Sequence, residues 1–153
     1  MKVKELMTKA PQTCTPDTTV AEAAQMMWEA DCGILPVVDD GELVGVVTDR
    51  DMYIALATQN ARAARLRVGA VATKDVVTCV AEDDVEAALA AMKHDRVRRL
   101  PVVGFGNTVV GLLSMNDIVR SVGTDNGVRP EDVIETLKAI CGRHHPSPQI
   151  VAA

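Results

Sequence analysis

The sequence predicts a mixed α/β (α+β) protein: two copies of a β-α-β-β-α unit, packed with pseudo-twofold symmetry and followed by a C-terminal helix. Three observations support this fold class. The chain repeats itself, and within each copy the hydrophobic pattern alternates between helical and strand-like periods. The composition is aliphatic, because 48% of the residues are hydrophobic and only 2% are aromatic. At 153 residues, the chain holds one ordinary domain or two very small ones.

The internal repeat organises the chain. A shift of 65 positions places residues 3–38 on residues 68–103, with the tetrapeptide Leu-Pro-Val-Val at 35–38 matching 100–103. One additional residue in the second copy makes the later shift 66 positions, which aligns Gly45 with Gly111. A unit of about 50 residues buries too little apolar surface to be stable alone. We therefore expect the two copies to pack face to face and to share one core.

Each copy predicts the same order of elements. Its first helix has apolar residues at helical spacing, as at Val20, Ala23 and Met27, and in the first copy it begins at a Thr19-x-x-Glu22 capping box. Runs rich in β-branched residues around a turn predict a hairpin, and a second helix follows each hairpin. The predicted ranges are extended segments 12–15 and 77–80, strands 34–38 and 43–47 or 100–103 and 109–113, and second helices 49–58 and 115–122.

The connections and boundaries follow from composition. Residues 54–67 are rich in Ala and Arg and predict that the second helix continues into the linker. Pro130 begins a C-terminal helix that Gly142 ends, with residues 121–129 before it as a loop. We assign residues 1–60 to repeat 1, 61–67 to a linker, 68–122 to repeat 2, and 123–153 to the C-terminal helix and a loose tail.

Composition also excludes several classes of protein. No run approaches the roughly 20 apolar residues that a membrane span needs, and no apolar signal segment follows Met1. A net charge of −5 and three aromatic residues argue against binding of nucleic acid. The four cysteines have no CxxC spacing, which indicates reduced, mostly buried thiols and a cytoplasmic protein.

In both copies, Leu-Pro-Val-Val is followed by Gly-x-x-Thr/Ser-x-x-Asp, which contains Thr48 and Asp51 or Ser114 and Asp117. This tandem pattern resembles the CBS-domain family, whose paired form is called a Bateman module. The resemblance covers nearly all of residues 3–121 and implies a stand-alone pair with two clefts between the repeats. In this family, such clefts commonly hold adenosyl ligands.

Thr48 and Ser114 stand where a strand gives way to a helix, so their hydroxyls lie beside unpaired amides that attract phosphate. Asp51 and Asp117 lie in the first helical turn, where a carboxylate can accept hydrogen bonds from both hydroxyls of a ribose. The resemblance assigns phosphate to Thr48 and Ser114 and ribose to the two aspartates. The same spacing also fits a helix cap that needs no ligand.

A basic cluster at residues 93–99 adds a second candidate for phosphate binding. Its Arg98 and Arg99 directly precede the second Leu-Pro and have no cationic counterpart in the first copy. Basic residues at this position contact nucleotide phosphates in similar modules. Arg50 and Asn116, one position before each aspartate, are further phosphate candidates by resemblance. The two clefts are therefore expected to be unequal, with only one equipped for a polyphosphate.

The adenine contacts are expected to be apolar and backbone groups, because aromatic rings are scarce. The candidates lie on the segments that enter the first extended run of each copy and on the first strand of the first hairpin. These residues are Thr8, Ala10, Ile34, Val37, Thr73 and Asp75.

No catalytic motif is present, and the sequence does not predict an enzyme. There is no phosphate-binding GxxxxGK[ST] loop and no GxSxG turn. Cys141, His144 and His145 form a weak metal-like cluster without a fourth ligand, so no metal site is assigned.

Two functional hypotheses remain open from the sequence. The first is a regulatory sensor that binds AMP, ADP or ATP, requires no cofactor, and signals to an unknown effector protein or through a homodimer formed by its second helices. The second is a ligand-independent interaction or scaffold module in which the Thr/Ser-x-x-Asp motifs only cap helices. A metal or redox response through Cys141, His144 and His145 is a third, weaker hypothesis.

Overall fold

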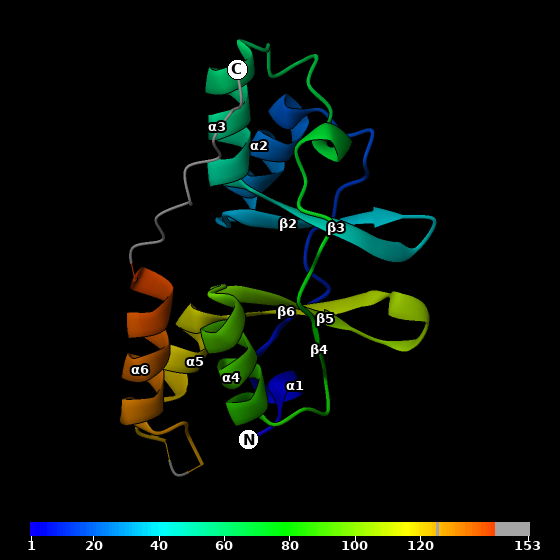
Figure 1. Ribbon diagram of the computed structural model, residues 1–153. Helices are drawn as coiled ribbons and strands as arrows, with labels where there is room; N and C mark the ends of the chain where they lie inside the picture. Colours follow the sequence, from blue (N-terminus) through cyan, green and yellow to red (C-terminus); the bar gives the residue numbers. More distant parts are fainter. Residues whose placement is uncertain (125, 143–153) are drawn as a thin grey trace, which may run out of the picture.

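The computed structural model describes residues 1–124 and 126–142, and Figure 1 shows its two β-hairpins lying between two groups of helices. A four-stranded sheet has the order β1-β6-β5-β4, and a two-stranded sheet contains β2 and β3. The predicted mixed α+β architecture with a C-terminal helix is confirmed. The elements are α1 (Val3–Leu6), β1 (Thr8–Lys9), α2 (Val20–Glu29), β2 (Ile34–Asp39), β3 (Glu42–Thr48), α3 (Asp49–Gln59), η1 (Val68–Ala70), β4 (Cys79–Val80), α4 (Val85–Asp95), β5 (Arg99–Val103), η2 (Phe105–Asn107), β6 (Val109–Ser114), α5 (Met115–Ser121) and α6 (Pro130–Cys141).

The first segment of each copy pairs with the hairpin of the other copy. Strand β1 lies antiparallel to β6, with Thr8 opposite Leu112. At the equivalent place, Thr73 forms an antiparallel bridge with Val46 of β3. These bonds make the two halves pseudo-symmetric and interlocked, because each half is completed by chain from the other.

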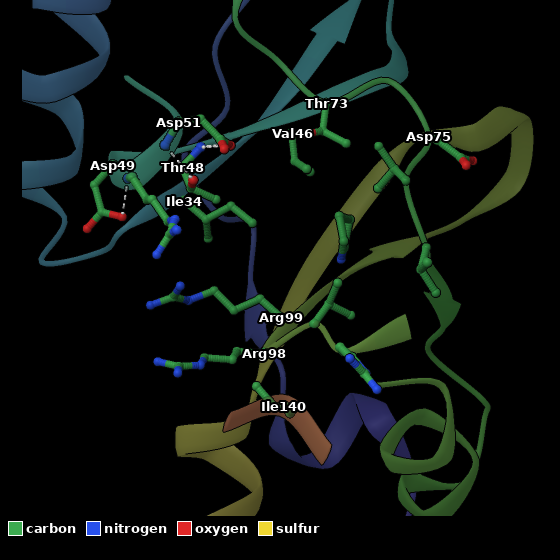
Figure 2. A pocket seen from close by; sticks show the side chains of 16 residues that line it. Ile34, Val46, Thr48, Asp49, Asp51, Thr73, Asp75, Arg98, Arg99 and Ile140 are labelled. Atoms are coloured by element: carbon green, nitrogen blue, oxygen red, sulfur yellow. Dashed lines mark hydrogen bonds between the residues drawn. The ribbon is translucent and has the colours of Figure 1, made fainter. Parts of the chain in front are cut away.

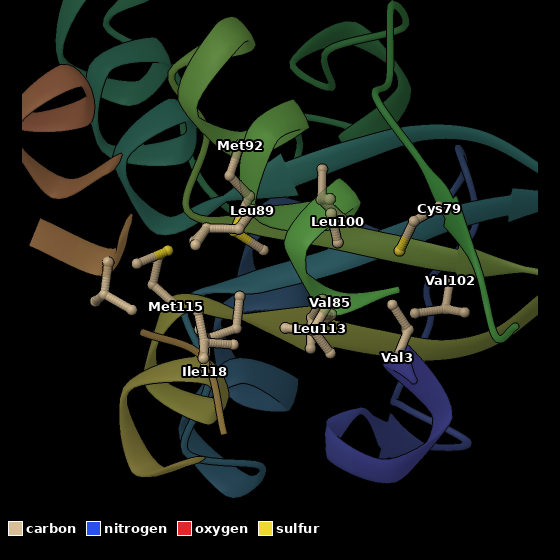
Figure 3. Close-up of a cluster of buried hydrophobic side chains, with 13 residues drawn as sticks. Val3, Cys79, Val85, Leu89, Met92, Leu100, Val102, Leu113, Met115 and Ile118 are labelled. Carbon is tan, nitrogen blue, oxygen red and sulfur yellow. The ribbon is translucent and has the colours of Figure 1, made fainter. Parts of the chain in front are cut away.

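The apolar side chains form two cores, so the expectation of one shared core is wrong. The reason is the exchange of segments: Val3 is fully buried in the second core, and its repeat equivalent Val68 is fully buried in the first. Figure 3 shows the core of the second repeat, here called the second core, where Val3 lies close to Val102 and Leu113. Each half therefore buries enough surface only with the segment that it receives.

Two predicted elements differ from the structure. Residues 12–15 do not form a strand, because their pairing is limited to one parallel bridge between Cys14 and Val37, and residues 77–80 form only the short strand β4. The predicted continuation of the second helix through residue 67 is also wrong. Helix α3 ends at Gln59, and Asn60 has the left-handed conformation, with φ of 48°.

Residues 61–67 do not continue helix α3; instead, two of their carbonyl groups accept hydrogen bonds from the start of α2. The N–H of Val20 donates to the Leu66 carbonyl at 2.8 Å, and that of Ala21 donates to the Ala63 carbonyl at 3.1 Å. A helix leaves its first N–H groups unpaired, so this segment satisfies the first turn of α2. Hydrogen bonds to another helix explain why the Ala- and Arg-rich composition does not produce helix here.

The hairpin turns follow their sequence signals. Asp40 and Gly41 form the two-residue turn between β2 and β3, with φ of 49° and 83°, as a type I′ turn requires. In the other hairpin, the Asn107 side-chain amide donates to the Leu43 carbonyl at 2.9 Å, a contact between the two halves.

The C-terminal helix packs against the second half of the protein. Helix α6 begins with Pro130 at its first turn, as predicted, and lies against α4. Val133 and Thr136 are buried there, and Lys93 forms an ion pair with Glu135 at 2.7 Å. This position brings the last turn of α6 to the space between the halves.

The exchange of segments leads to a test. Val3→Ala should lower the free energy of unfolding by about 2 kcal/mol, because it removes two buried carbons and leaves a cavity. Hydrogen exchange should accelerate first in β5 and β6, whereas Val68→Ala should accelerate it first in β2 and β3. Denaturant unfolding with native-state hydrogen exchange measures both effects. The control is Val80→Ala, whose side chain is 45% exposed. Loss of protection first in the repeat to which the substituted residue belongs in sequence, rather than in the repeat whose core it enters, would contradict the exchange.

Candidate ligand-binding clefts

Thr48 and Asp51 form a complete capping box at the start of α3. The Thr48 hydroxyl accepts from the Asp51 N–H at 3.1 Å, and Asp51 Oδ2 accepts from the Thr48 N–H at 3.2 Å. Within the described residues, Asp51 Oδ1 has no hydrogen-bond partner. The cap therefore holds the carboxylate in place and leaves one of its oxygens available to a ligand.

Ser114 and Asp117 form the equivalent box at the start of α5, but its carboxylate is more fully occupied. Asp117 Oδ2 accepts from the Ser114 N–H at 2.9 Å and from the Ser114 hydroxyl at 2.5 Å. Arg120 forms an ion pair with Asp117 Oδ1 at 2.7 Å. Asp117 is 8% exposed, so this carboxylate is buried with both oxygens bonded.

The first capping box lies in a cavity of about 530 Å³, here called cleft 1. Figure 2 shows Thr48, Asp49 and Asp51 at one side of this cleft, with Arg98 and Arg99 reaching out from the chain of the other repeat. Residues from both repeats and from α6 form its walls. They are Ile34, Val46, Thr48, Asp49, Arg50, Asp51, Thr73, Asp75, Val76, Val77, Arg96, Val97, Arg98, Arg99, Pro101 and Ile140.

The second capping box lies in a cavity of about 600 Å³, here called cleft 2. Its walls again come from both repeats, in the arrangement that pseudo-twofold symmetry requires. They are Thr8, Pro11, Gln12, Ala30, Asp31, Cys32, Ile34, Arg99, Leu112, Ser114, Asn116, Asp117, Val119 and Arg120.

The two clefts differ in charge. Four arginines and three aspartates line cleft 1, whereas two arginines and two aspartates line cleft 2. In cleft 2, the Arg120 charge is already paired with Asp117. Cleft 1 therefore offers more guanidinium groups to an anion, and this is the chemical inequality that the sequence led us to expect.

The structure brings most of the predicted site residues together. Thr48, Arg50, Asp51, Thr73, Asp75 and Arg98 line cleft 1; Thr8, Ser114, Asn116 and Asp117 line cleft 2; and Ile34 and Arg99 line both. Two adenine candidates are elsewhere. Ala10 lines neither cleft, and Val37 is 1% exposed in the first core, on a strand position that faces away from the clefts toward a small hollow beside Pro16.

Several lining residues escaped the sequence analysis. Arg96 takes the left-handed conformation at the end of α4 and lines cleft 1, where its repeat equivalent Asp31 lines cleft 2. The alignment of the repeats could have identified this pair, because it matches the cation Arg96 with the anion Asp31. Ile140 of α6 also lines cleft 1, and it had no signal because α6 has no counterpart in the repeat.

The cysteines are free and differ in exposure. Cys14 and Cys79 are buried, and burial raises the pKa of each thiol to about 11. Cys32 is partly buried, and Cys141 is exposed. The expectation of mostly buried thiols therefore does not hold for Cys141. Within the described ranges, no three His, Cys, Asp or Glu side chains are placed to hold a metal ion. Residues 144 and 145 of the metal-like cluster lie outside those ranges.

Among the described helices, none is both long and apolar enough to cross a membrane.

The fold and the paired clefts define a pair of ligand-binding repeats, and comparison with known proteins identifies the family. The family model for the CBS domain matches twice, at residues 3–58 and 68–124, so this chain belongs to the CBS-domain family. The CBS domain-containing protein YhcV of Bacillus subtilis is 34% identical over 116 residues, which are 76% of this chain and 81% of that protein. Inosine-5'-monophosphate dehydrogenase of Methanocaldococcus jannaschii is 36% identical over 94% of this chain, but the chain spans only 28% of that enzyme.

Solved structures show the same architecture. The CBS domain pair of protein MJ0100, in complex with 5'-methylthioadenosine and S-adenosyl-L-methionine, aligns with a TM-score of 0.71 and 30% identity, covering 78% of this chain and 98% of that chain. The CBS domain protein TA0289 of Thermoplasma acidophilum has a TM-score of 0.80 at 23% identity, over 98% of this chain and 83% of its own. The second likeness, which includes the region of α6, supports the fold alone.

The cap at Thr48 leads to a second prediction. Thr48→Val removes the hydroxyl that accepts from Asp51 and should lower the free energy of unfolding by about 1 kcal/mol without added ligand. Thr48→Ser keeps the hydroxyl and should remain within about 0.5 kcal/mol of the natural protein. Urea unfolding monitored by circular dichroism measures the difference. Equal stability of the Val and Ser variants would show that the cap does not stabilise α3.

Proposed function

We propose that this protein is a regulatory module that binds an adenosyl ligand between its repeats, and that cleft 1 prefers an adenine nucleotide. One observation carries the proposal: the Thr48–Asp51 cap of one repeat and Arg98 and Arg99 of the other face the same cavity of about 530 Å³. A ligand that contacts both sides joins the two repeats. Its binding therefore depends on their relative position.

The residues of cleft 1 suit the parts of a nucleotide. Asp51 has a carboxylate oxygen without a partner in the described residues, and this oxygen can accept a ribose hydroxyl. The N–H groups of Asp49, Arg50 and Asp51 already donate to protein oxygens, so the expectation of unpaired amides at this helix start is wrong. The guanidinium groups of Arg50, Arg98 and Arg99 are therefore the proposed donors for phosphate. Arginine matches phosphate with paired donors, so the excess of arginines favours a phosphorylated ligand.

The adenine ring is proposed to lie against aliphatic and backbone groups. Ile34 and Val46 form apolar walls in cleft 1, and Thr73 lies at the crossing segment beside them (Figure 2). Asp75 lies at the same side of the cleft as Thr73 and is an additional polar candidate. The complex of protein MJ0100 with two adenosyl compounds supports the class of ligand, and the arginines of this chain support the preference within it.

A signal from cleft 1 must reach another molecule. Helices α3 and α5 carry exposed apolar side chains, with Tyr53 74% exposed, Ile54 41% and Val119 46%. These residues support a homodimer through the second helices, in which ligand binding changes the geometry of the pair. An unidentified effector protein is the alternative receiver, and a cytoplasmic setting remains a prediction from the free cysteines.

A second function is favoured by one observation. Both capping boxes are complete without a ligand, and in cleft 2 both oxygens of Asp117 are bonded to protein groups. A scaffold or interaction module would need the motifs only for these caps. Ligand binding decides between the two functions.

Thermal unfolding with AMP, ADP, ATP, NADH, 5'-methylthioadenosine and S-adenosylmethionine tests the proposal. A ligand that binds only the folded state adds about 2.7 kcal/mol of stability at a hundredfold excess over its Kd, and ATP or another adenine nucleotide should give the largest shift. The protein must first be freed of copurified nucleotide. Absence of a shift with every compound would overturn the sensor and favour the scaffold.

Arg98→Ala gives the matched test of the phosphate contact. It should weaken ATP binding about tenfold or more and leave adenosine binding unchanged, because only ATP carries phosphates. Arg65→Ala is the control, because this substitution removes the same charge from an exposed residue that lines neither cleft. An equal loss of ATP affinity in the two variants would show that the effect comes from the change in net charge and not from a contact between Arg98 and phosphate.

The homodimer has its own test. Tyr53→Ser combined with Ile54→Ser should shift the sedimentation coefficient from dimer to monomer, because both side chains are exposed on α3 and would lose apolar burial between subunits. Phe105→Ser, in the η2 turn, is the control, since Phe105 is fully exposed away from α3 and α5. A monomeric natural protein would contradict the homodimer and direct attention to the effector protein.

A further inference from the structure

Two residues line both clefts, and they are equivalent in the repeat. Ile34 begins β2 and pairs with Thr48, while Arg99 begins β5 and pairs with Ser114. In a fully symmetric pair of repeats these positions would carry the same side chain. Here one side chain shared by the clefts is an aliphatic group that is 5% exposed, and the other is a partly buried cation.

The Arg99 guanidinium is available to a ligand. In the part of the chain that the structure describes, it has no hydrogen-bond or ion-pair partner. Partial burial withdraws a cation from water, so a charged partner is favourable. Figure 2 shows the side chain reaching into the open space below Ile34 and Thr48.

The two clefts depend on this group to different degrees. Cleft 1 also has Arg50 and Arg98, which do not line cleft 2. The other arginine of cleft 2 is Arg120, and it is paired with Asp117 at 2.7 Å. Arg99 is therefore the cation of cleft 2 that no carboxylate of the described residues holds.

We propose that Arg99 is shared between the clefts and makes phosphorylated ligands compete: when a phosphate in cleft 1 holds its guanidinium, cleft 2 loses its unpaired cation. The planar guanidinium makes its paired hydrogen bonds with one phosphate at a time. This inference rests on the proposed function and concerns how the two clefts are coupled. Uncharged adenosyl compounds need no such contact, so cleft 2 remains open to them.

Calorimetric titration with ATP, combined with backbone amide shifts of Ser114 and Asp117 to report cleft 2, tests the coupling. In the natural protein, ATP should enter cleft 2 only after cleft 1 is filled. Arg50→Ala combined with Arg98→Ala weakens cleft 1 without altering either capping box, so ATP should then bind cleft 2 about tenfold more tightly than the second ATP binds the natural protein. Adenosine should bind cleft 2 equally in both proteins.

Arg99→Gln, introduced into both the natural protein and the Arg50→Ala, Arg98→Ala variant, should remove the tenfold difference in ATP affinity between them. Arg99→Ile should do the same, because it places at position 99 the residue found at the equivalent position 34. Arg65→Gln is the matched control and should preserve the difference. A difference that survives in both Arg99 variants would assign the coupling to repulsion between ligands and overturn the proposal, as would two equal ATP sites in the natural protein. No binding of ATP or of any other adenosyl compound would instead overturn the proposed function.

Discussion

The reciprocal pairing of the crossing segments supports the rest of the structure. Thr8 lies against Leu112 and Thr73 against Val46, so each hairpin is completed by chain from the other repeat. Gly45 permits this approach, because a Cβ atom there would lie 2.9 Å from the Thr73 carbonyl oxygen. Both cores and both clefts follow from the exchange: cores need the buried valine of the incoming segment, and each cleft lies where that segment meets a helix start.

The repeat builds two similar clefts, and a few substitutions make them chemically different. Both contain a Thr/Ser-x-x-Asp capping box, but Arg120 occupies the second carboxylate, whereas position 54 in the first copy is an isoleucine. Arg98 faces cleft 1, and its equivalent is Gly33, where a Cβ atom would lie 2.8 Å from Asp49 Oδ2. Pseudo-symmetry thus fixes the positions of the groups, and single side chains decide the charge that a ligand meets.

Local features were predictable because they depend on near neighbours in the chain. The hairpins, the capping boxes and the start of α6 follow from turn residues, cap residues and Pro130. The failures involve distant partners. Residues 61–67 are not helical because their carbonyls accept hydrogen bonds from α2. There are two cores instead of one because Val3 and Val68 are each buried in the core of the other repeat.

The sequence by itself determined the repeat, the family resemblance and the residue types of the candidate ligand-binding clefts, since these lie in short motifs and in their alignment. Only the tertiary structure decided that Arg98 faces Thr48 and Asp51, that Arg99 borders both clefts, that Val37 belongs to a core, and that Ile140 closes cleft 1 from α6. The physical reason is that a cleft is formed by segments far apart in sequence. Which of them meet depends on hydrogen bonds and burial across the whole fold.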